Sequence, residues 1–265
     1  MENINTVKAP EEVKPDEEHV VKMWTPYNIK VDENYKFISD NPVFNAVSGG
    51  LKAFALPALA GLNKLAFNLE IIGRENLEPL KDQGFITVCN HVNLLDCGMI
   101  ANAVGRRDIT FTTIKENFEI PVVRILVKLL GGIPIPRSAK AMAKFSEAVS
   151  QLLKEGHVIH FYPEGVLFPY YNGIRGFRRG AFSYAVKNDV PIAPMIITYH
   201  EPKSKLRKKP VAKIHVLTPV YPDTSLPERE AIRNLKDKVT LSMQSAFDNS
   251  GSLKDNSAVL AKYKK

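Results

Sequence analysis

From about residue 70 onward, short apolar runs that suit strands alternate with longer stretches of helical spacing. The runs expected to form strands are residues 69–72, 85–89, 109–113, 157–162, 192–198 and 213–217. The stretches with helical spacing are residues 94–104, 121–130, 139–154, 180–187 and 228–247. This alternation is typical of a sheet covered by helices on both faces. We therefore predict a single α/β domain with a mostly parallel or mixed central sheet flanked by helices.

A different pattern occupies residues 41–69, where the only charges are Lys52 and Lys64 and apolar residues recur at helical spacing. The longest charge-free run, residues 53–63, falls short of the roughly 20 residues that one spanning helix needs. Glycines and Pro57 also interrupt the segment. We therefore expect a bent amphipathic segment or helical hairpin in a lipid interface, with its lysines reaching the headgroups. An ordinary amphipathic helix packed on the domain is the alternative.

By composition the chain divides into four parts. These are a polar lead (residues 1–40), the amphipathic segment (41–69), the α/β domain (70–250) and a polar basic tail (251–265). The acidic N-terminus lacks the apolar core of a signal peptide, so we do not expect secretion. The only cysteines, Cys89 and Cys97, argue against a disulfide framework and favour a reducing, cytoplasmic location.

The net charge of +8 is unevenly distributed along the chain. The first twenty residues hold six acids and two lysines, whereas residues 171–215 hold ten Lys or Arg and two acids. A basic surface attracts phosphate, whether of nucleic acid, anionic lipid or a small substrate, and a solvated charged face is the alternative. The basic stretch 203–209 has no interleaved aromatic residue and no recognition motif, so we expect no nucleic acid partner.

A histidine and an aspartate stand five positions apart, where the expected strand 85–89 gives way to a helix. On a continuous helix His91 and Asp96 would lie about 140° apart, but with His91 on the turn the carboxylate can reach the imidazole. A carboxylate on one ring nitrogen leaves the other free to accept a proton from a hydroxyl. The chain has no G-x-S-x-G motif, so the expected nucleophile is a substrate hydroxyl that attacks a thioester. A helix-capping Asp beside a structural His is the alternative.

Other motifs follow these two residues in order. They are Lys-Glu-Asn-Phe-Glu-Ile-Pro at 115–121, Gly-Gly-Ile-Pro-Ile-Pro-Arg at 131–137, Phe-Tyr-Pro-Glu-Gly at 161–165, Gly-Phe-Arg-Arg-Gly-Ala at 176–181 and Val-Pro-Ile-Ala-Pro-Met at 190–195. With Asn90-His91 and Asp96 as the first block, the chain resembles the glycerolipid acyltransferase superfamily, particularly bacterial 1-acyl-sn-glycerol-3-phosphate (lysophosphatidate) acyltransferases. One departure is that Val166-Leu167 follow the Glu-Gly pair, where the family usually has Thr-Arg.

The resemblance implies transfer of a fatty acyl chain from acyl-CoA or acyl-carrier protein to the free hydroxyl of lysophosphatidate, giving phosphatidate in phospholipid synthesis. His91 would be the base and Asp96 would orient it, with no metal and no cofactor. Because of Val166-Leu167, glycerol 3-phosphate or another lysophospholipid is an alternative acceptor. From a different class, a non-catalytic anionic-lipid-binding protein would also explain the basic and amphipathic regions.

Six residues in these motifs are expected to bind substrate, namely Asn90, Lys115, Arg137, Glu164, Gly165 and Arg178. Lys115 and Arg137 follow expected strands on the edge that holds His91, so they can converge on an acceptor phosphate. Glu164 can bind a glycerol hydroxyl or orient the basic residues, and Gly165 lets backbone approach a ligand closely. A purely structural ion pair between Arg137 and Glu164 is the alternative.

The remaining candidate groups do not suggest a second chemistry. His157 and His160 are three apart on an expected strand and so face opposite ways, which argues against a shared metal site. Nothing basic stands near Cys97 to activate it as a nucleophile. The expected partners are thus a lysophospholipid acceptor, the acyl donor and an anionic membrane surface, bound peripherally or monotopically at the cytoplasmic face. The sequence leaves the oligomeric state open.

Overall fold

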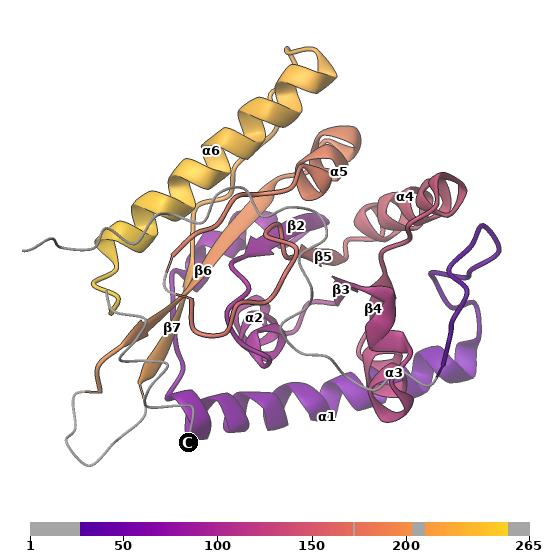
Figure 1. Cartoon of the computed structure of the whole chain (residues 1–265), viewed down its shortest axis with the longest axis horizontal. Coiled ribbons are helices and arrows are strands. Elements are labelled where there is room, and N and C mark those ends of the chain that lie inside the picture. The colour runs from indigo at the N-terminus through magenta and orange to yellow at the C-terminus, as the bar shows by residue number, and fades with distance from the viewer. Residues whose placement is uncertain (1–26, 172, 203–209, 254–265) are drawn as a thin grey trace, which may run out of the picture.

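The computed structural model describes residues 27–171, 173–202 and 210–253 of the chain. Its central sheet has seven strands in the order β1-β7-β6-β2-β5-β3-β4 (Figure 1). The strands are β1 (Glu70–Ile72), β2 (Phe85–Cys89), β3 (Ile109–Thr113), β4 (Gly132–Pro134), β5 (Val158–Phe161), β6 (Ile192–His200) and β7 (Val211–Val216). All neighbouring strands are parallel except β6 and β7. The predicted mixed α/β sheet is confirmed.

Eight helical elements surround the sheet in the described part of the chain. They are α1 (Pro42–Phe67), α2 (Asp96–Val104), α3 (Pro121–Leu129), α4 (Ala139–Lys154), α5 (Gly180–Asn188) and α6 (Glu228–Asn249), with two 3-10 helices, η1 (Arg74–Leu80) and η2 (Lys115–Phe118). The five helices predicted after residue 70 all form, with ends within two residues of the expected ones. Strand β4 was not predicted.

Alternate strand residues feed two hydrophobic cores, one on each face of the sheet. On β2, Phe85 and Cys89 pack toward α2 and η1, whereas Ile86 and Val88 pack toward α4, α5 and α6. This period of two is the strand geometry that the apolar runs predicted. As a result the edge where the parallel strands end is held rigidly from both faces.

Helix α1 is continuous over its 26 residues, so the predicted hairpin is wrong. Its ends are well capped, since the side chain of Asn41 accepts hydrogen bonds from the N–H groups of Val43 and Phe44, and Asn68 adopts a left-handed conformation at the other end. The helix also packs on α2 and α3 along its length. These contacts outweigh the cost of the glycines and Pro57 inside it.

The side of α1 that faces the domain carries several polar residues, whereas Lys64 is exposed. Ser48 donates a hydrogen bond to the carbonyl of Leu129, and Asn63 is fully buried. Lys52 pairs with Asp108 at 2.9 Å, so it does not extend to a headgroup as predicted. The opposite side exposes large apolar residues, namely Val43, Val47, Phe54, Leu62 and Leu65.

Within the described residues, α1 is also the one helix that is long and apolar enough to cross a membrane, by length and composition only. The sequence-based expectation was that this segment is too short to cross a membrane as a single helix. The length of α1 does not support that expectation. The helix nevertheless lies against α2 and α3 along the lower side of the domain in Figure 1.

Part of the predicted lead lies against the domain. Phe37 contacts Phe145 of α4, and the backbone N–H of Tyr27 donates to Glu119. The rest of the lead (1–26), the basic stretch 203–209 and most of the tail (254–265) lie outside the described residues.

Candidate active site

The candidate site lies where the parallel strands β2 and β5 end side by side. Their register pairs Val88 with Phe161, so the residues that follow each strand emerge together at the carboxyl edge of the sheet. After β2 comes His91, and after β5 come Tyr162 and Glu164. Ligands of α/β sheets bind at such an edge. The turn after β5 continues along this edge, because the N–H of Phe168 donates to the carbonyl of His91.

His91 and Asp96 form the predicted pair. Nδ1 of His91 lies 2.7 Å from Oδ2 of Asp96, which is the first residue of α2. The same oxygen accepts the backbone N–H of Val92 at 3.2 Å. Asp96 is buried, and the side chain of His91 is 22% exposed. Among the described residues, Nε2 of His91 has no hydrogen-bond partner, so it is available to a substrate.

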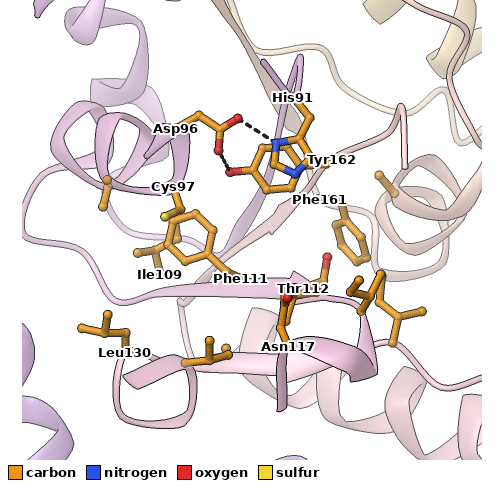
Figure 2. Close-up of a pocket in the computed structure, with 18 of the residues that line it drawn as sticks. His91, Asp96, Cys97, Ile109, Phe111, Thr112, Asn117, Leu130, Phe161 and Tyr162 are labelled. Carbon is orange, nitrogen blue, oxygen red and sulfur yellow. Dashed lines mark hydrogen bonds and ion pairs between the residues drawn. The ribbon is translucent and has the colours of Figure 1, made fainter. Parts of the chain in front are cut away.

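Tyr162 completes the surroundings of this pair (Figure 2). Its hydroxyl donates to Oδ1 of Asp96 at 2.5 Å, and its ring stacks on the imidazole of His91 with 3.8 Å between ring centroids. Burial and the charge of Asp96 raise the pKa of Tyr162 well above its usual value, so the hydroxyl stays a donor. Tyr162 belongs to the motif at 161–165, but no role was predicted for it, although its position directly after a central strand was a usable signal.

Glu164 does not line the cavity but pairs with a basic residue. Its carboxylate is buried, accepts the backbone N–H of His91 at 3.1 Å and pairs with the buried guanidinium of Arg175 at 2.5 Å. Burial raises the pKa of Glu164, and Arg175 opposes that rise. Glu164 is not among the described residues that line the cavity, so this geometry gives no support to a contact with a glycerol hydroxyl. It holds the turn that carries His91.

Asn90 likewise points into the protein rather than toward a ligand. Its fully buried side chain exchanges two hydrogen bonds with the backbone of Ile197 on β6, at 3.0 and 2.8 Å. It therefore fixes the end of β2 against the neighbouring strand and is a support for His91, not a substrate contact.

A large cavity of about 2130 Å³ opens around His91. Its walls come from α1, α2, β3, the segment after β4 and the turn after β5. Figure 2 shows Phe111, Ile109 and Leu130 on one side of it, away from the His91–Asp96 pair. The cavity is larger than the few hundred to about 1,000 Å³ of a typical small-molecule pocket, and much of its wall is apolar.

Several cationic side chains line the same cavity, among them Lys115, Arg137, Arg178 and Arg179. The alternative of a structural ion pair between Arg137 and Glu164 is not seen, because Arg137 contacts Glu116 at 2.7 Å. Lys115 contacts Glu119 at 3.0 Å. The structure thus brings the predicted phosphate-binding residues to one cavity, and it adds Arg179.

Gly165 allows another group to approach its backbone closely, but that group is the side chain of Arg178 and not a ligand. It has a φ of +79°, and a Cβ at this position would lie 2.6 Å from Nε of Arg178. Only glycine therefore fits both the backbone and the arginine that lies over it. The next two residues are apolar: Val166 is nearly buried, and Leu167 lines the cavity. Arg178 and Arg179, a little downstream of Leu167, line the same cavity.

Cys97 faces the cavity beside Asp96 but is not an activated thiol. Its side chain is exposed to the cavity, yet desolvation there and the negative charge of Asp96 raise its pKa to about 12. Within the described residues, no group of three His, Cys, Asp or Glu side chains is arranged to hold a metal ion.

Comparison with known proteins gives a consistent result. Residues 68–198 match the family model described as Acyltransferase. A protein of Chlamydomonas reinhardtii named 1-acyl-sn-glycerol-3-phosphate acyltransferase is 33% identical over 132 residues, which cover 49% of this chain and 39% of that protein. Chloroplastic proteins of the same name from Brassica napus and Arabidopsis thaliana are 30% and 29% identical over 49% of this chain. The matched regions span well under half the length of these relatives.

A solved structure shares the fold. The crystal structure of the 1-acyl-sn-glycerophosphate acyltransferase PlsC from Thermotoga maritima superposes with a TM-score of 0.52 and 21% identity, covering 79% of this chain and 84% of that one. At this identity the similarity establishes the architecture alone.

Proposed function

Because residues 68–198 form an acyltransferase-family domain, we propose that the protein transfers a fatty acyl chain to the free hydroxyl of lysophosphatidate, giving phosphatidate. The donor in this proposal is a thioester, either acyl-CoA or acyl-carrier protein. The observation that carries it is the 2.7 Å contact between Nδ1 of His91 and Asp96, with Nε2 left to the cavity. The names of the relatives support the choice of acceptor.

His91 acts as the base in this reaction. Nε2 takes the proton of the acceptor hydroxyl while the hydroxyl oxygen attacks the thioester carbonyl carbon. The tetrahedral intermediate then breaks its C–S bond, and the proton passes from Nε2 to the departing thiol. Asp96 fixes the tautomer and favours the transient imidazolium. With Cys97 held as a neutral thiol, the acyl group passes directly from donor to acceptor.

The cavity can accommodate both parts of an amphiphilic acceptor. Its cationic wall, with Arg137 and Lys115, suits the phosphate, since guanidinium binds phosphate oxygens in a bidentate way. Its apolar wall beside α1 and β3 suits an acyl chain. His91 lines the same cavity, so the free hydroxyl of a lysophospholipid bound there would lie within reach of its Nε2.

We further propose that α1 attaches the protein to the cytoplasmic face of an anionic membrane as an interfacial helix. Its exposed apolar side has no partner within the described residues, whereas its polar side faces the domain. This is the reverse of a helix that covers a soluble core. An interfacial position would bring the cavity, which α1 helps to line, next to the lipid that holds the acceptor.

The test is acyl transfer by the purified protein from radiolabelled acyl-CoA to a panel of acceptors, separated by thin-layer chromatography. We expect transfer to lysophosphatidate, no turnover in His91→Ala, and a loss of orders of magnitude in Asp96→Asn. Arg137→Ala should raise the KM for the acceptor and leave that for the donor unchanged. Substantial activity in folded His91→Ala protein would refute the mechanism and favour a non-catalytic lipid-binding protein.

A second acceptor has one specific observation in its favour. Leu167 lines the cavity where the family usually places an arginine, so this wall offers one charge less to a phosphate. If glycerol 3-phosphate or another lysophospholipid were acylated faster than lysophosphatidate in the same panel, the acceptor assignment would change while the reaction type would remain.

A further inference from the structure

Tyr162 is held against both members of the His91–Asp96 pair. In the strand alternation of β5, Phe161 packs toward α4 and α5, whereas Tyr162 packs toward the core under α2. Asp96 begins α2, so the phenol oxygen meets the carboxylate at 2.5 Å. The same ring lies parallel to the imidazole, with 16° between the two planes and 3.8 Å between their centroids.

A second histidine fixes Tyr162 from behind. The buried ring of His160 meets Tyr162 edge-on at 4.4 Å, and its Nδ1 lies 2.8 Å from the hydroxyl of Thr87 on β2. Burial lowers the pKa of His160 to about 3, so this ring is neutral and can pack closely. Tyr162 therefore has little freedom to rotate away from the pair.

We propose that Tyr162 is a positioning residue for the reaction: its hydroxyl fixes the carboxylate of Asp96, and its ring face supports the imidazole of His91. This inference rests on the proposed function for its kinetic consequences. Each carboxylate oxygen of Asp96 then has its own partner, Oδ2 the imidazole and Oδ1 the phenol. When His91 takes a proton, the imidazolium lies over an aromatic face, which attracts a cation.

Tyr162→Phe separates these two contributions, because it removes the hydroxyl and keeps the stacked ring. We expect kcat to fall by about tenfold, the size of one hydrogen bond to a buried charge, with KM for both substrates within about twofold of wild type. Tyr162→Leu, which also loses the ring face, should lower kcat further. Tyr35→Phe is the matched control, because Tyr35 packs against Phe37 with the two rings tilted and is not among the residues that line the cavity.

The pH profile adds a readout that a structural role would not move. Without the phenol donor, Asp96 attracts the imidazolium proton more strongly, so the acidic limb of kcat/KM should move to higher pH in Tyr162→Phe. The other titratable groups around the pair are Glu164 and Cys89 at the ends of the two strands, Cys97 on α2 and His160 on β5. None of these is altered by the substitution.

An activity-independent arm separates this inference from the proposed function. The nuclear magnetic resonance signals of the His91 ring should shift in Tyr162→Phe but not in Tyr35→Phe. In an Asp96→Ala background the Tyr162→Phe shift should largely disappear, since the link between phenol and imidazole is gone. If wild type transfers no acyl group, the proposed function fails and these signals still decide the role of Tyr162. Unchanged ring signals, or a change in KM alone, would overturn the inference.

Discussion

Helices α1 and α6 lie on opposite sides of the same sheet (Figure 1). They turn opposite faces toward the domain. α6 buries Ala231, Leu235, Val239 and Met243 at a spacing of four and leaves a charged face to solvent. α1 turns Ser48, Lys52 and Asn63 toward the domain and leaves apolar residues such as Phe54 and Leu65 outside, 81% and 82% exposed.

The difference shows that an apolar stripe does not by itself identify a helix's partner. The apolar stripe of α6 is buried in the core that this helix covers, so it needs no further partner outside the domain. The stripe of α1 stays largely exposed in the described chain, and exposing so much apolar surface to water is unfavourable. A lipid interface would remove that cost. Four experiments test this difference between the two helices.

The largest effect is expected from a pair of identical truncations. Leu235→Ala on α6 removes a fully buried side chain and should lower the free energy of unfolding by about 2–5 kcal/mol. Leu65→Ala on α1 removes an exposed one and should change it by less than about 0.5 kcal/mol. Chemical denaturation in the absence of lipid measures both. Equal losses would mean that α1 is an ordinary packed helix.

The second experiment moves the same contrast to a membrane. Leu65→Glu should weaken binding to anionic vesicles at least about tenfold, because a buried leucine contributes about 1.5–3 kcal/mol and a carboxylate is repelled. Leu241→Glu is the matched control, since Leu241 is 71% exposed on α6. Vesicle co-sedimentation gives the affinity, and circular dichroism confirms folding. Should the Leu241 variant lose binding and the Leu65 variant keep it, docking would lie on the other side of the molecule.

Local patterns were sufficient to predict most of the fold. Helix α4 has the predicted bounds and β2 ends at the predicted residue, because their side-chain periods match the cores that they enter. Strand β4 escaped prediction since three residues ending in Pro134 are too short for a period of two. Strand β4 forms because the chain after α3 lies alongside β3, where Phe111 pairs with Gly132.

The site was predictable only where its partners are close in sequence. The spacing of His91 and Asp96 was sufficient to predict their contact. The partner of Glu164 could not be found in this way, because Arg175 lies eleven positions further along the chain and only the fold brings it back to Glu164. The continuity of α1 was missed for a similar reason: caps and contacts with α2 and α3 override its glycines.

The third experiment concerns the inner side of α1. Asn63 is fully buried, and neither polar atom of its side chain has a hydrogen-bond partner within the described chain. Leu59 and Gly98 lie nearby. Asn63→Leu should therefore raise the free energy of unfolding by about 1 kcal/mol, since an unsatisfied buried amide is removed. Asn63→Asp should lower it. Thermal and chemical denaturation would contradict this if the leucine variant were the less stable one.

The smallest effect separates the two lysines of α1, which the sequence alone assigns equally to lipid headgroups. Lys64 is exposed near the end of the helix, whereas Lys52 is committed to Asp108 with its side chain 25% exposed. A lysine near an anionic surface contributes about 1 kcal/mol, so Lys64→Gln should weaken vesicle binding about fivefold at low salt. Lys52→Gln should change it less, because that ammonium already has a carboxylate partner. At high ionic strength both variants should bind like the parent chain, since the Debye length falls to about 3 Å at 1 M salt. Co-sedimentation across a salt series makes the comparison, and a larger loss in Lys52→Gln would place the inner side of α1 against the lipid.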